Sequence, residues 1–418
     1  MGRTSPGKGG ASVKYVVLII DGASGWPVAS LGGQTSLEAA HTPHLDRLAR
    51  EGTVGVADNV PEGMEASSAV ACMSVMGFDP ALYYAGRGPI EATAMGIELE
   101  AGQVAMRCNL VTVADGRLVS YSAGNISSEE ARELVDALRD ELADERLGLY
   151  SGVGFRHILT VREGGDLLAT RFSPAHDVTG RPVEDFGPVG PGAALVRGLT
   201  ERSKAILAGH PVNRARIARG QPPATQIWLF WPGMKPERLP SFAAANGRRR
   251  AVMTSAVDLL RGLALQTGVD LVAIPGVTDA GDNDYKAQMA GALAALTDHD
   301  VAFVHVEAPD EASHAGDLAG KVRAIEQVDA LMVPQVTGAV GAAPGGGPAE
   351  DLSLLVLPDH PTPAEIKTHV AEPVPFVMWG PGYAPNGARA FSEAEARATG
   401  FAAAPGHILL SMFLGRGR

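Results

Sequence analysis

Three short segments of the chain carry carboxylates and histidines at spacings that suit metal binding. Asp21 follows an apolar run, and Asp310 precedes His314 by four residues in the segment APDEASHAG. The third segment, VLPDHPTPAEIKTHVAEPVPF, contributes Asp359, His360 and His369. Mixed carboxylate and imidazole ligands suit Mn²⁺, Zn²⁺ or iron, whereas a site for Ca²⁺ would not need histidines. Such groups can hold two metals about 4 Å apart, which clamp the attacking and leaving oxygens of a phosphoryl transfer.

Strand and helix patterns place these residues at one edge of a sheet. In the run Lys14 to Ile20, the residues from Tyr15 onward are continuously apolar, which is typical of a strand covered on both faces. Further strand-like runs occupy 270–274, 301–306, 352–357 and 375–379, and helices are expected at 252–265, 286–298 and 317–338. This alternation predicts an α/β layered sheet with right-handed crossovers. Because ligands bind at the carboxyl ends of strands in such sheets, Asp21, Asp310 and Asp359 are expected to converge.

The middle of the chain, about 106–247, differs from both ends. It is rich in Arg, Gly and Pro, and its strand candidates, such as Arg156 to Val161 and Gln226 to Phe230, are short. With 418 residues, the chain is too long for one simple core. We therefore predict a metal-binding domain from 14–105 and 248–418, an inserted substrate-binding domain at 106–247, a disordered tail at 1–13 and a flexible loop at 338–351.

The composition disfavours several classes of protein. Lys plus Arg number 35 and Asp plus Glu 47, and this net charge of −12 argues against nucleic-acid partners and anionic membrane surfaces. The longest apolar run is too short to span a membrane, and the polar N-terminal stretch lacks the apolar core of a signal peptide. The two cysteines, Cys72 and Cys108, form no CxxC motif, which fits a reducing cytoplasm and excludes a disulfide framework. We expect a cytoplasmic protein.

Several segments, spread in order over about residues 14–415, carry a resemblance to a known family. They are VVLIIDG, AHTPHLDRLAREG, SVMGFDPALYYAGRGPIEA, AMRCNLVT, ISSEEA, HPVNRAR, VEAPDEASHAGD, VLPDHPTP and THVAEPVPF. The chain resembles the archaeal-type, 2,3-bisphosphoglycerate-independent phosphoglycerate mutases of the alkaline phosphatase superfamily. The resemblance implies an alkaline-phosphatase-like layered sheet with helices on both faces, and a smaller inserted α/β domain.

The resemblance also implies a nucleophile. In the family, a serine about a dozen residues before the GxDP turn is phosphorylated, and counting back from Pro80 gives Ser68, with Ser67 as the neighbouring alternative. A serine hydroxyl is a weak nucleophile at neutral pH. A bound metal lowers its pKa, so that the alkoxide can attack phosphorus without a base beside it.

Two divalent metal ions are implied in the same way. One would be held by Asp310, His314 and His369. The other would be held by Asp21, Ser68, Asp359 and His360. Mn²⁺ is the expected ion, and Zn²⁺, Co²⁺ and Mg²⁺ are compatible with the same ligands, because affinity follows availability as much as ligand type.

The implied reaction moves phosphate from 3-phosphoglycerate to Ser68 and then to the 2-hydroxyl of glycerate trapped between the domains, a step of glycolysis. The inserted domain must hold the carboxylate and exclude water, or the enzyme becomes a phosphatase. Guanidinium forks suit this task because they bind carboxylate or phosphate bidentately. The segments that match the family supply Arg87, Arg107, Arg156 and Arg216 as substrate ligands, and His176 as an acid or base. A homo-oligomer is compatible with the sequence.

Departures from the family pattern leave alternatives open. Asn125 replaces an arginine before the ISSEEA segment, Ala69 and Cys72 replace polar residues after the serine, and Trp231 replaces a glycine. The loop at 279–284 is unusually acidic. The alternative to the mutase is therefore a relative with a changed acceptor, such as a homoserine kinase. A metal-dependent phosphatase is a further alternative, whereas the full set of metal residues disfavours a binding protein without catalysis.

Overall fold

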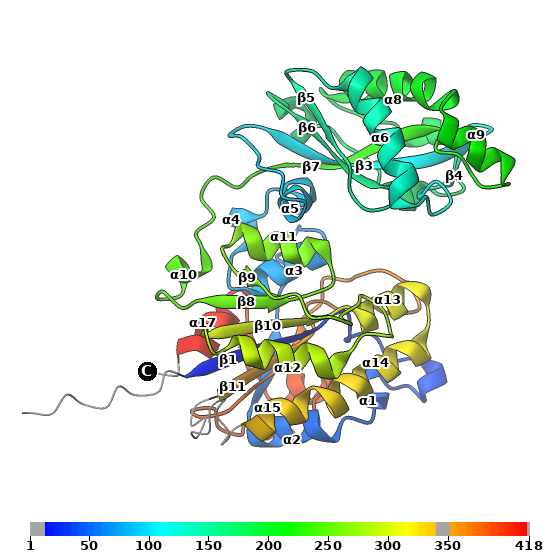
Figure 1. The fold of residues 1–418 in the computed structure, drawn as a ribbon. Helices are drawn as coiled ribbons and strands as arrows, with labels where there is room; N and C mark the ends of the chain where they lie inside the picture. Colours follow the sequence, from blue (N-terminus) through cyan, green and yellow to red (C-terminus); the bar gives the residue numbers. More distant parts are fainter. Residues whose placement is uncertain (1–12, 340–351, 416–418) are drawn as a thin grey trace, which may run out of the picture. The chain divides into compact units, whose positions relative to one another are not determined.

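The computed structural model describes residues 13–339 and 352–415 (Figure 1). It divides the chain into unit 1, Met1–Tyr84 with Leu239–Arg418, and unit 2, Ala85–Arg238. The tail predicted at 1–13 and the loop predicted at 338–351 lie almost wholly outside the described residues. Among residues 13–339 and 352–415, none of the helices combines the length and the apolar composition that crossing a membrane requires.

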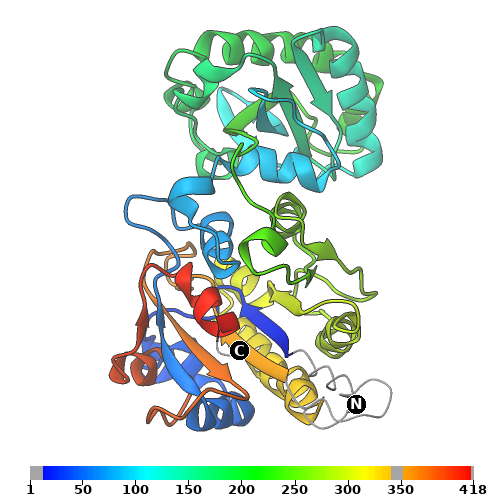
Figure 2. The same cartoon turned by 90° about the vertical axis from the view of Figure 1, so that its left-hand side faces the viewer.

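Unit 1 is built on an eight-stranded sheet with the order β13-β2-β12-β11-β1-β10-β8-β9. The strands are β1 Lys14–Ile20, β2 Thr53–Ala57, β8 Ala251–Thr254, β9 Asp270–Leu271, β10 Val301–Val306, β11 Leu352–Leu357, β12 Val374–Trp379 and β13 Ala402–Ala403. The central strand β1 runs parallel to β10 on one side and to β11 on the other (Figure 2). All residues of β10 and β11 are buried, as are six of the seven in β1, so the prediction of strands covered on both faces is confirmed.

Helices cover both faces of this sheet. They are α1 Ser36–Ala39, α2 Pro43–Glu51, α3 Ser68–Val75, α4 Pro80–Tyr83, α10 Phe242–Ala245, α11 Asp258–Gln266, α12 Tyr285–Ala295, α13 Ala308–Ala315, α14 Leu318–Leu331, α15 Val333–Ala339, α16 Glu393–Ala398 and α17 Ile408–Gly415, with a 3₁₀ turn at Ala29–Leu31. Val16, Leu18 and Ile20 of β1 share one core with α2, α12 and α14. On the opposite face, the Tyr15 ring packs edge-on against Phe413 of α17, with 5.3 Å between ring centroids.

Two of the predicted helices differ from the observed elements. The pattern predicts one helix over 252–265, but Ala251–Thr254 form the buried strand β8, and α11 begins only at Asp258. Parallel pairing of β8 with β10 therefore overrides the helical spacing. The helix predicted over 317–338 is divided into α14 and α15 at Met332, because Pro334 lacks the amide hydrogen that a continuous helix needs.

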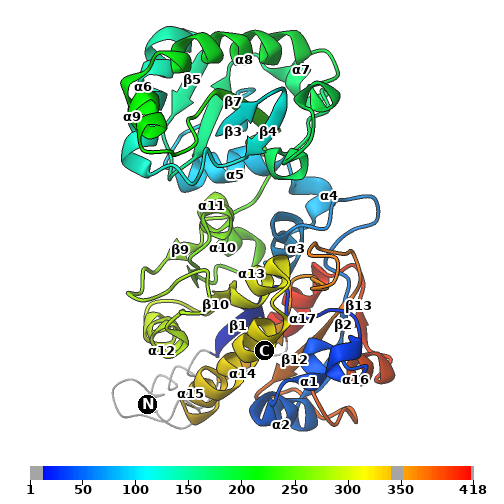
Figure 3. The ribbon, with the colours of Figure 1, turned by 90° about the vertical axis from the view of Figure 1, so that its right-hand side faces the viewer.

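Unit 2 holds a five-stranded antiparallel sheet. Its strands are β3 Val104–Ala114, β4 Arg117–Ser120, β5 Leu147–Tyr150, β6 Arg156–Val161 and β7 Gln226–Met234, and the long β3 pairs with β4, β6 and β7. The helices are α5 Arg87–Ala94, α6 Ser128–Leu142, α7 Gly165–Leu168, α8 Ala193–Ala208 and α9 Pro211–Ala218, with 3₁₀ turns η2 Ala175–Val178 and η3 Val183–Phe186. Helices α6 and α8 share a core with one face of the sheet, and α5 packs on the other (Figure 3).

The borders of the inserted unit differ from those expected. The sequence places them at 105/106 and 247/248, whereas the compact unit spans Ala85–Arg238. The reason is α5, whose Ala92 lies in a buried cluster with Ala105 and Ile158 of the unit 2 sheet. A Cβ atom at Gly88 would lie 2.2 Å from the carbonyl oxygen of Ala105, so this helix and β3 are in close backbone contact.

Candidate functional site

The carboxyl ends of β11, β1 and β10 bring three predicted carboxylates into one region of unit 1. Asp21 directly follows β1, Asp310 lies in the first turn of α13 after β10, and Asp359 lies two residues beyond β11. Each of them is at most 2% exposed. Burying several carboxylates together is unfavourable unless cations accompany them. The predicted convergence is therefore observed, and it favours a site for positive charge.

The first predicted ligand group is assembled by α13 and the segment before β12. The Asp310 Oδ2 atom lies 3.0 Å from Nε2 of His314, one turn further along α13, and 3.6 Å from Nε2 of His369. The two Nε2 atoms are 2.9 Å apart. One carboxylate oxygen and two imidazole nitrogens thus surround a single point, as in a site for a transition metal.

The outer hydrogen bonds of these histidines fix their protonation. Nδ1 of His314 lies 3.0 Å from the carbonyl oxygen of Lys367, and Nδ1 of His369 lies 3.1 Å from that of Ala66. A carbonyl only accepts, so each Nδ1 carries a hydrogen and Nε2 of each ring is the atom available to bind a metal. A metal ion between the two Nε2 atoms would use both of their lone pairs. The hydrogen bond with Asp310 raises the pKa of His314 to about 9, which means that a proton is held here when no metal is bound.

The second predicted group adjoins the first. Nε2 of His360 lies 3.1 Å from Oδ2 of Asp359 and 3.8 Å from Oδ1 of Asp21. Burial lowers the pKa of His360 to about 4, so its imidazole is neutral. Burial, together with Asp359 and Asp310, raises the pKa of Asp21 well above its ordinary value. The Oδ1 atom of Asp21 is buried without a hydrogen-bond partner among the described residues, as expected of a metal ligand.

Ser68 completes this group, and Ser67 does not. The Ser68 Oγ atom lies 3.2 Å from Nε2 of His360, while Ser67 Oγ donates to the exposed Glu65 carboxylate at 3.4 Å. Ser68 is the first residue of α3, whose N-terminus has no side-chain cap. The nearby Cys72 thiol is buried, 3.6 Å from Oδ2 of Asp359. Unpaired amides at a helix N-terminus favour a bound anion such as phosphate.

Thr362 contacts both groups and was not predicted from the sequence. Its hydroxyl donates to Oδ1 of Asp310 at 2.6 Å and lies 3.2 Å from Nδ1 of His360. Because the hydroxyl hydrogen of Thr362 is already bonded to Asp310, the hydroxyl oxygen accepts a hydrogen bond from Nδ1–H of His360. The lone pair on Nε2 of His360 then faces Asp359. The Lys321 ammonium fixes the same loop by donating to the Thr362 and Ser24 carbonyls at 2.8 and 3.0 Å. A threonine between two prolines, directly after Asp359 and His360, was the available signal.

His305 and Glu307 were also missed. Nε2 of His305 lies 2.8 Å from Oδ2 of Asp21, and its Nδ1 lies 3.0 Å from Oγ of Ser255. His305 therefore holds the Asp21 carboxylate in one orientation, as outer hydrogen-bond partners of metal ligands do. Asp21, His305 and Glu307 also form a group with the spacing of a metal site. The signal was a histidine at the end of the otherwise apolar strand VAFVHV.

In unit 2 the structure brings Arg87 and Arg107 together. Their Nε atoms lie 2.7 and 3.0 Å from the two oxygens of Glu91, a carboxylate that is 6% exposed. Burial acts to raise the pKa of Glu91, but Arg107 and Arg87 outweigh it, so that the pKa is lowered. Arg156, the third predicted ligand on this side, contributes to the same lowering. The two guanidinium groups and the single carboxylate together carry a net positive charge, which favours an anionic ligand.

The Trp231 ring lies at the edge of this cluster and contacts two of the predicted substrate ligands. The Arg87 guanidinium lies 4.1 Å from the centre of the Trp231 ring, and the His176 ring lies 5.6 Å from it. Trp231 has φ 51°, in the left-handed region, where glycine is favoured over other residues. This conformation accounts for the glycine that the resemblance implies at this position, and it makes the tryptophan of this chain a strained residue beside the predicted substrate ligands.

Arg216 does not join these residues. Its side chain is buried, Nε donates to the carbonyl oxygen of Pro222 at 3.0 Å, Nη2 donates to that of Ala123 at 2.6 Å, and Nη1 pairs with Glu130. These bonds engage all three guanidinium nitrogens within unit 2. The structure therefore gives Arg216 a structural role in place of the substrate contact that the resemblance implied.

Local structure also accounts for two departures from the family pattern. Asn125 has φ 51°, a conformation that asparagine adopts more readily than arginine does. In the acidic loop, Asp282 accepts from the Thr278 hydroxyl at 2.7 Å, and Asp284 caps α12 by accepting from the amide of Ala287 at 2.9 Å. Loop and cap bonds thus engage two of the three loop carboxylates.

The chain is similar to known proteins over most of its length. A model of the family 2,3-bisphosphoglycerate-independent phosphoglycerate mutase matches residues 49–213. A protein of that name from Methanosarcina acetivorans is 43% identical over 383 residues, which cover 91% of this chain and 94% of the relative. The chain belongs to this family. The assignment made from the sequence segments is thereby confirmed.

Solved structures agree on the fold of this phosphoglycerate mutase family. A protein from Pyrococcus horikoshii superposes with a TM-score of 0.80 at 25% identity, covering 97% of both chains. A cofactor-independent phosphoglycerate mutase from Thermoplasma acidophilum gives a TM-score of 0.65 at 24% identity, covering 97% of this chain and 100% of the other. The predicted α/β architecture is therefore shared by both.

Proposed function

We propose that this protein is a metal-dependent phosphoglycerate mutase that interconverts 3-phosphoglycerate and 2-phosphoglycerate through a phosphoserine at Ser68. The observation that carries the proposal is the position of the Ser68 hydroxyl, 3.2 Å from Nε2 of His360 within the cluster of buried carboxylates and imidazoles. The family membership supports the same activity, because the relative that is 43% identical bears the name of such a mutase.

Two divalent ions fit the ligands of unit 1. Asp310, His314 and His369 would hold one, and Asp21, Asp359 and His360 with Ser68 would hold the other. Mn²⁺ is the ion we propose. When bound, the ions supply Lewis acidity that lowers the pKa of the serine hydroxyl and neutralises phosphate charge. The N-terminus of α3 adds amide donors and a favourable dipole for the phosphoryl group on Ser68.

The residues of unit 2 would bind the rest of the substrate. Arg87 and Arg107, held by Glu91, present cationic donors for the carboxylate of glycerate, and Arg156 extends the positive charge. His176, beside Trp231, would serve as the acid or base. We further propose a cytoplasmic protein of glycolysis that acts on a small phosphorylated substrate, without nucleic-acid or membrane partners, and that is able to form a homo-oligomer.

A phosphorus NMR time course tests the activity. Purified enzyme with Mn²⁺ and 3-phosphoglycerate should yield 2-phosphoglycerate without free phosphate. Release of phosphate would identify a phosphatase instead. Formation of phosphohomoserine from ATP and homoserine in a parallel sample, with no isomerisation in the first, would identify a changed acceptor.

Substitutions test the nucleophile. Ser68→Ala should abolish turnover and leave the metal bound, whereas His314→Ala should lose metal as well. The neighbouring exposed serine provides a matched control, because Ser67→Ala should retain most activity. Full activity of Ser68→Ala would show that another residue accepts the phosphate.

A further inference from the structure

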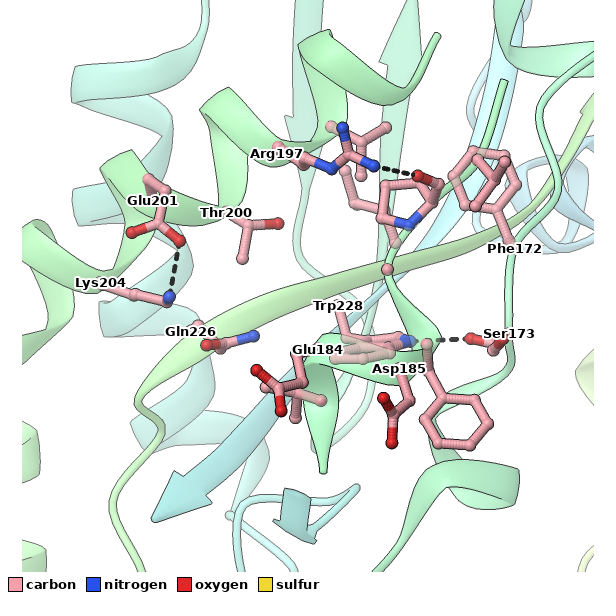
Figure 4. Close-up of a pocket in the computed structure, with 17 residues that line it drawn as sticks. Phe172, Ser173, Glu184, Asp185, Arg197, Thr200, Glu201, Lys204, Gln226 and Trp228 are labelled. Carbon is pink, nitrogen blue, oxygen red and sulfur yellow. Dashed lines mark hydrogen bonds and ion pairs between the residues drawn. The ribbon is translucent and has the colours of Figure 1, made fainter. Parts of the chain in front are cut away.

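Unit 2 contains a pocket of about 430 Å³ beside β7, and none of the metal ligands or substrate arginines described above lines it (Figure 4). This volume lies in the range of small-molecule sites. Its walls include Phe172, Phe186 and Trp228. In Figure 4, side chains of α8 lie along one side, and Glu184 and Asp185 along the other. The pocket is therefore largely apolar, with polar groups at defined positions.

Gln226 is the polar group that points to a ligand. The residue is 4% exposed, and its carboxamide has no hydrogen-bond partner among the described residues. Figure 4 shows this carboxamide in the pocket, between Thr200 and Glu184. A carboxamide offers two donor hydrogens and an acceptor oxygen side by side. Because buried polar groups are normally paired, a ligand with a matching donor and acceptor would complete it.

The charges at the rim disfavour an anion. Lys204 is paired with Glu201 at 2.6 Å, which balances one positive charge. Arg197 donates to the carbonyl oxygen of Pro188 at 2.7 Å and keeps its charge. Glu184 and Asp185 make no ion pair with any residue that the structure describes. The pocket lining therefore carries three acidic and two basic side chains, and this excess of negative charge favours a neutral ligand over a phosphorylated one.

We propose that this pocket binds the base of a purine nucleoside that carries an amino donor next to a ring-nitrogen acceptor, as adenine does. A glutamine carboxamide pairs with such an edge through two hydrogen bonds. The flat base would pack on the aromatic walls, as bases stack on aromatic side chains elsewhere. This site does not depend on the proposed mutase function, since its residues lie outside both ligand groups.

Titration of the full-length protein by calorimetry tests the proposal, with adenosine as the probe. Adenosine should bind saturably at one site. Purine riboside, which lacks the amino group, should bind at least about tenfold more weakly, because one of the two hydrogen bonds is lost. AMP should bind no more tightly than adenosine. Absence of saturable adenosine binding, or clearly tighter binding of AMP, would overturn the assignment.

Matched variants locate the site. Gln226→Leu should weaken adenosine binding at least about tenfold, since it removes both hydrogen-bonding groups at similar volume. The same substitution at the exposed Gln221, outside the pocket, should leave the affinity unchanged. Circular dichroism reports whether each variant folds. If Gln226→Leu does not fold, the comparison of adenosine with purine riboside on the wild-type protein makes the same test. Equal affinity of a folded Gln226→Leu and the wild type would contradict the proposal.

Discussion

Thr362 is a single residue whose hydroxyl bonds to one ligand of each predicted metal. It donates to Asp310 and lies within hydrogen-bond distance of His360. Removing such an outer partner typically weakens metal binding about 10- to 100-fold. Thr362→Val should therefore lower the Mn²⁺ affinity of the metal-free protein by this factor in calorimetry. Thr362→Ser keeps the hydroxyl and should restore most of the affinity, whereas equal affinity of the valine variant and the wild type would refute the role.

Trp231 allows backbone strain to be measured separately from side-chain contacts. A residue other than glycine at φ 51° loses roughly 1–2 kcal/mol of stability. Trp231→Gly and Trp231→Ala both remove the indole, but only alanine keeps a Cβ atom in the left-handed conformation. The glycine variant should be more stable by about 1 kcal/mol in urea unfolding. Equal stabilities would mean that the backbone relaxes after the indole is removed.

Sequence reasoning identified the residues that carry chemistry better than those that support them. Asp21, Asp310 and Asp359 were predictable because each follows a strand that reads clearly as buried. His305 was not singled out, because a lone histidine on an apolar strand resembles many core histidines. Arg216 was misassigned because a matching segment gives the residue type but not the groups around it, and only the structure reveals Glu130 beside it.

At the scale of elements, α14 fixes the turn after β1 to the loop after β11 through Lys321. Burial lowers the pKa of this lysine from 10.5 to about 8. Between these pH values the unfolded chain binds a proton that the folded chain does not, so the free energy of unfolding should rise with pH. Lys321→Met should remove this rise. In urea unfolding at several pH values, the slope of the free energy of unfolding against pH should differ between the variant and the wild type by the equivalent of one bound proton.

An exposed lysine serves as the control for this pH experiment. Lys286, at the start of α12, is exposed, and Lys286→Met should leave the pH dependence of stability as in the wild type. Identical slopes for the wild type and Lys321→Met would show that the ammonium of Lys321 does not lose its proton in this range.

Element boundaries were predictable where burial alone decides them. The strands β1, β10 and β11 are almost wholly apolar runs, and their positions were predicted within a residue. Most of the short strand β8 was read as part of a helix because Val252, Met253 and Thr254 satisfy both patterns, and only pairing with β10 selects the strand. The helix α5 was assigned to the wrong unit because its partner Ile158 is distant in sequence from Ala92, and its other partner, Ala105, was placed on the same side of the predicted border.

For the whole molecule, the separate hydrophobic cores of units 1 and 2 predict that a bound metal stabilises one unit and not the other. All proposed metal ligands belong to unit 1, and unit 2 has its own hydrophobic core. A ligand stabilises the unit that binds it, by about 2.7 kcal/mol when present at a hundred times its dissociation constant. Calorimetry of the Mn²⁺-loaded protein should resolve two unfolding transitions. A chelator should lower the midpoint temperature of only one of them. His314→Ala should lower the temperature of the same transition, whereas a single transition that shifts as a whole would show that the units unfold together.

The position of β1 in the sheet has a consequence for how the protein is made. Its neighbours β10 and β11 come near the far end of the chain, and 284 residues separate Asp21 from His305. At roughly 5–20 residues per second, a ribosome needs about 15–60 s to deliver that partner. During this time a strand of almost wholly apolar residues has emerged without either neighbour, while Ala85–Arg238 can already fold. The newly made β1 is therefore the segment at which chaperone binding competes with aggregation.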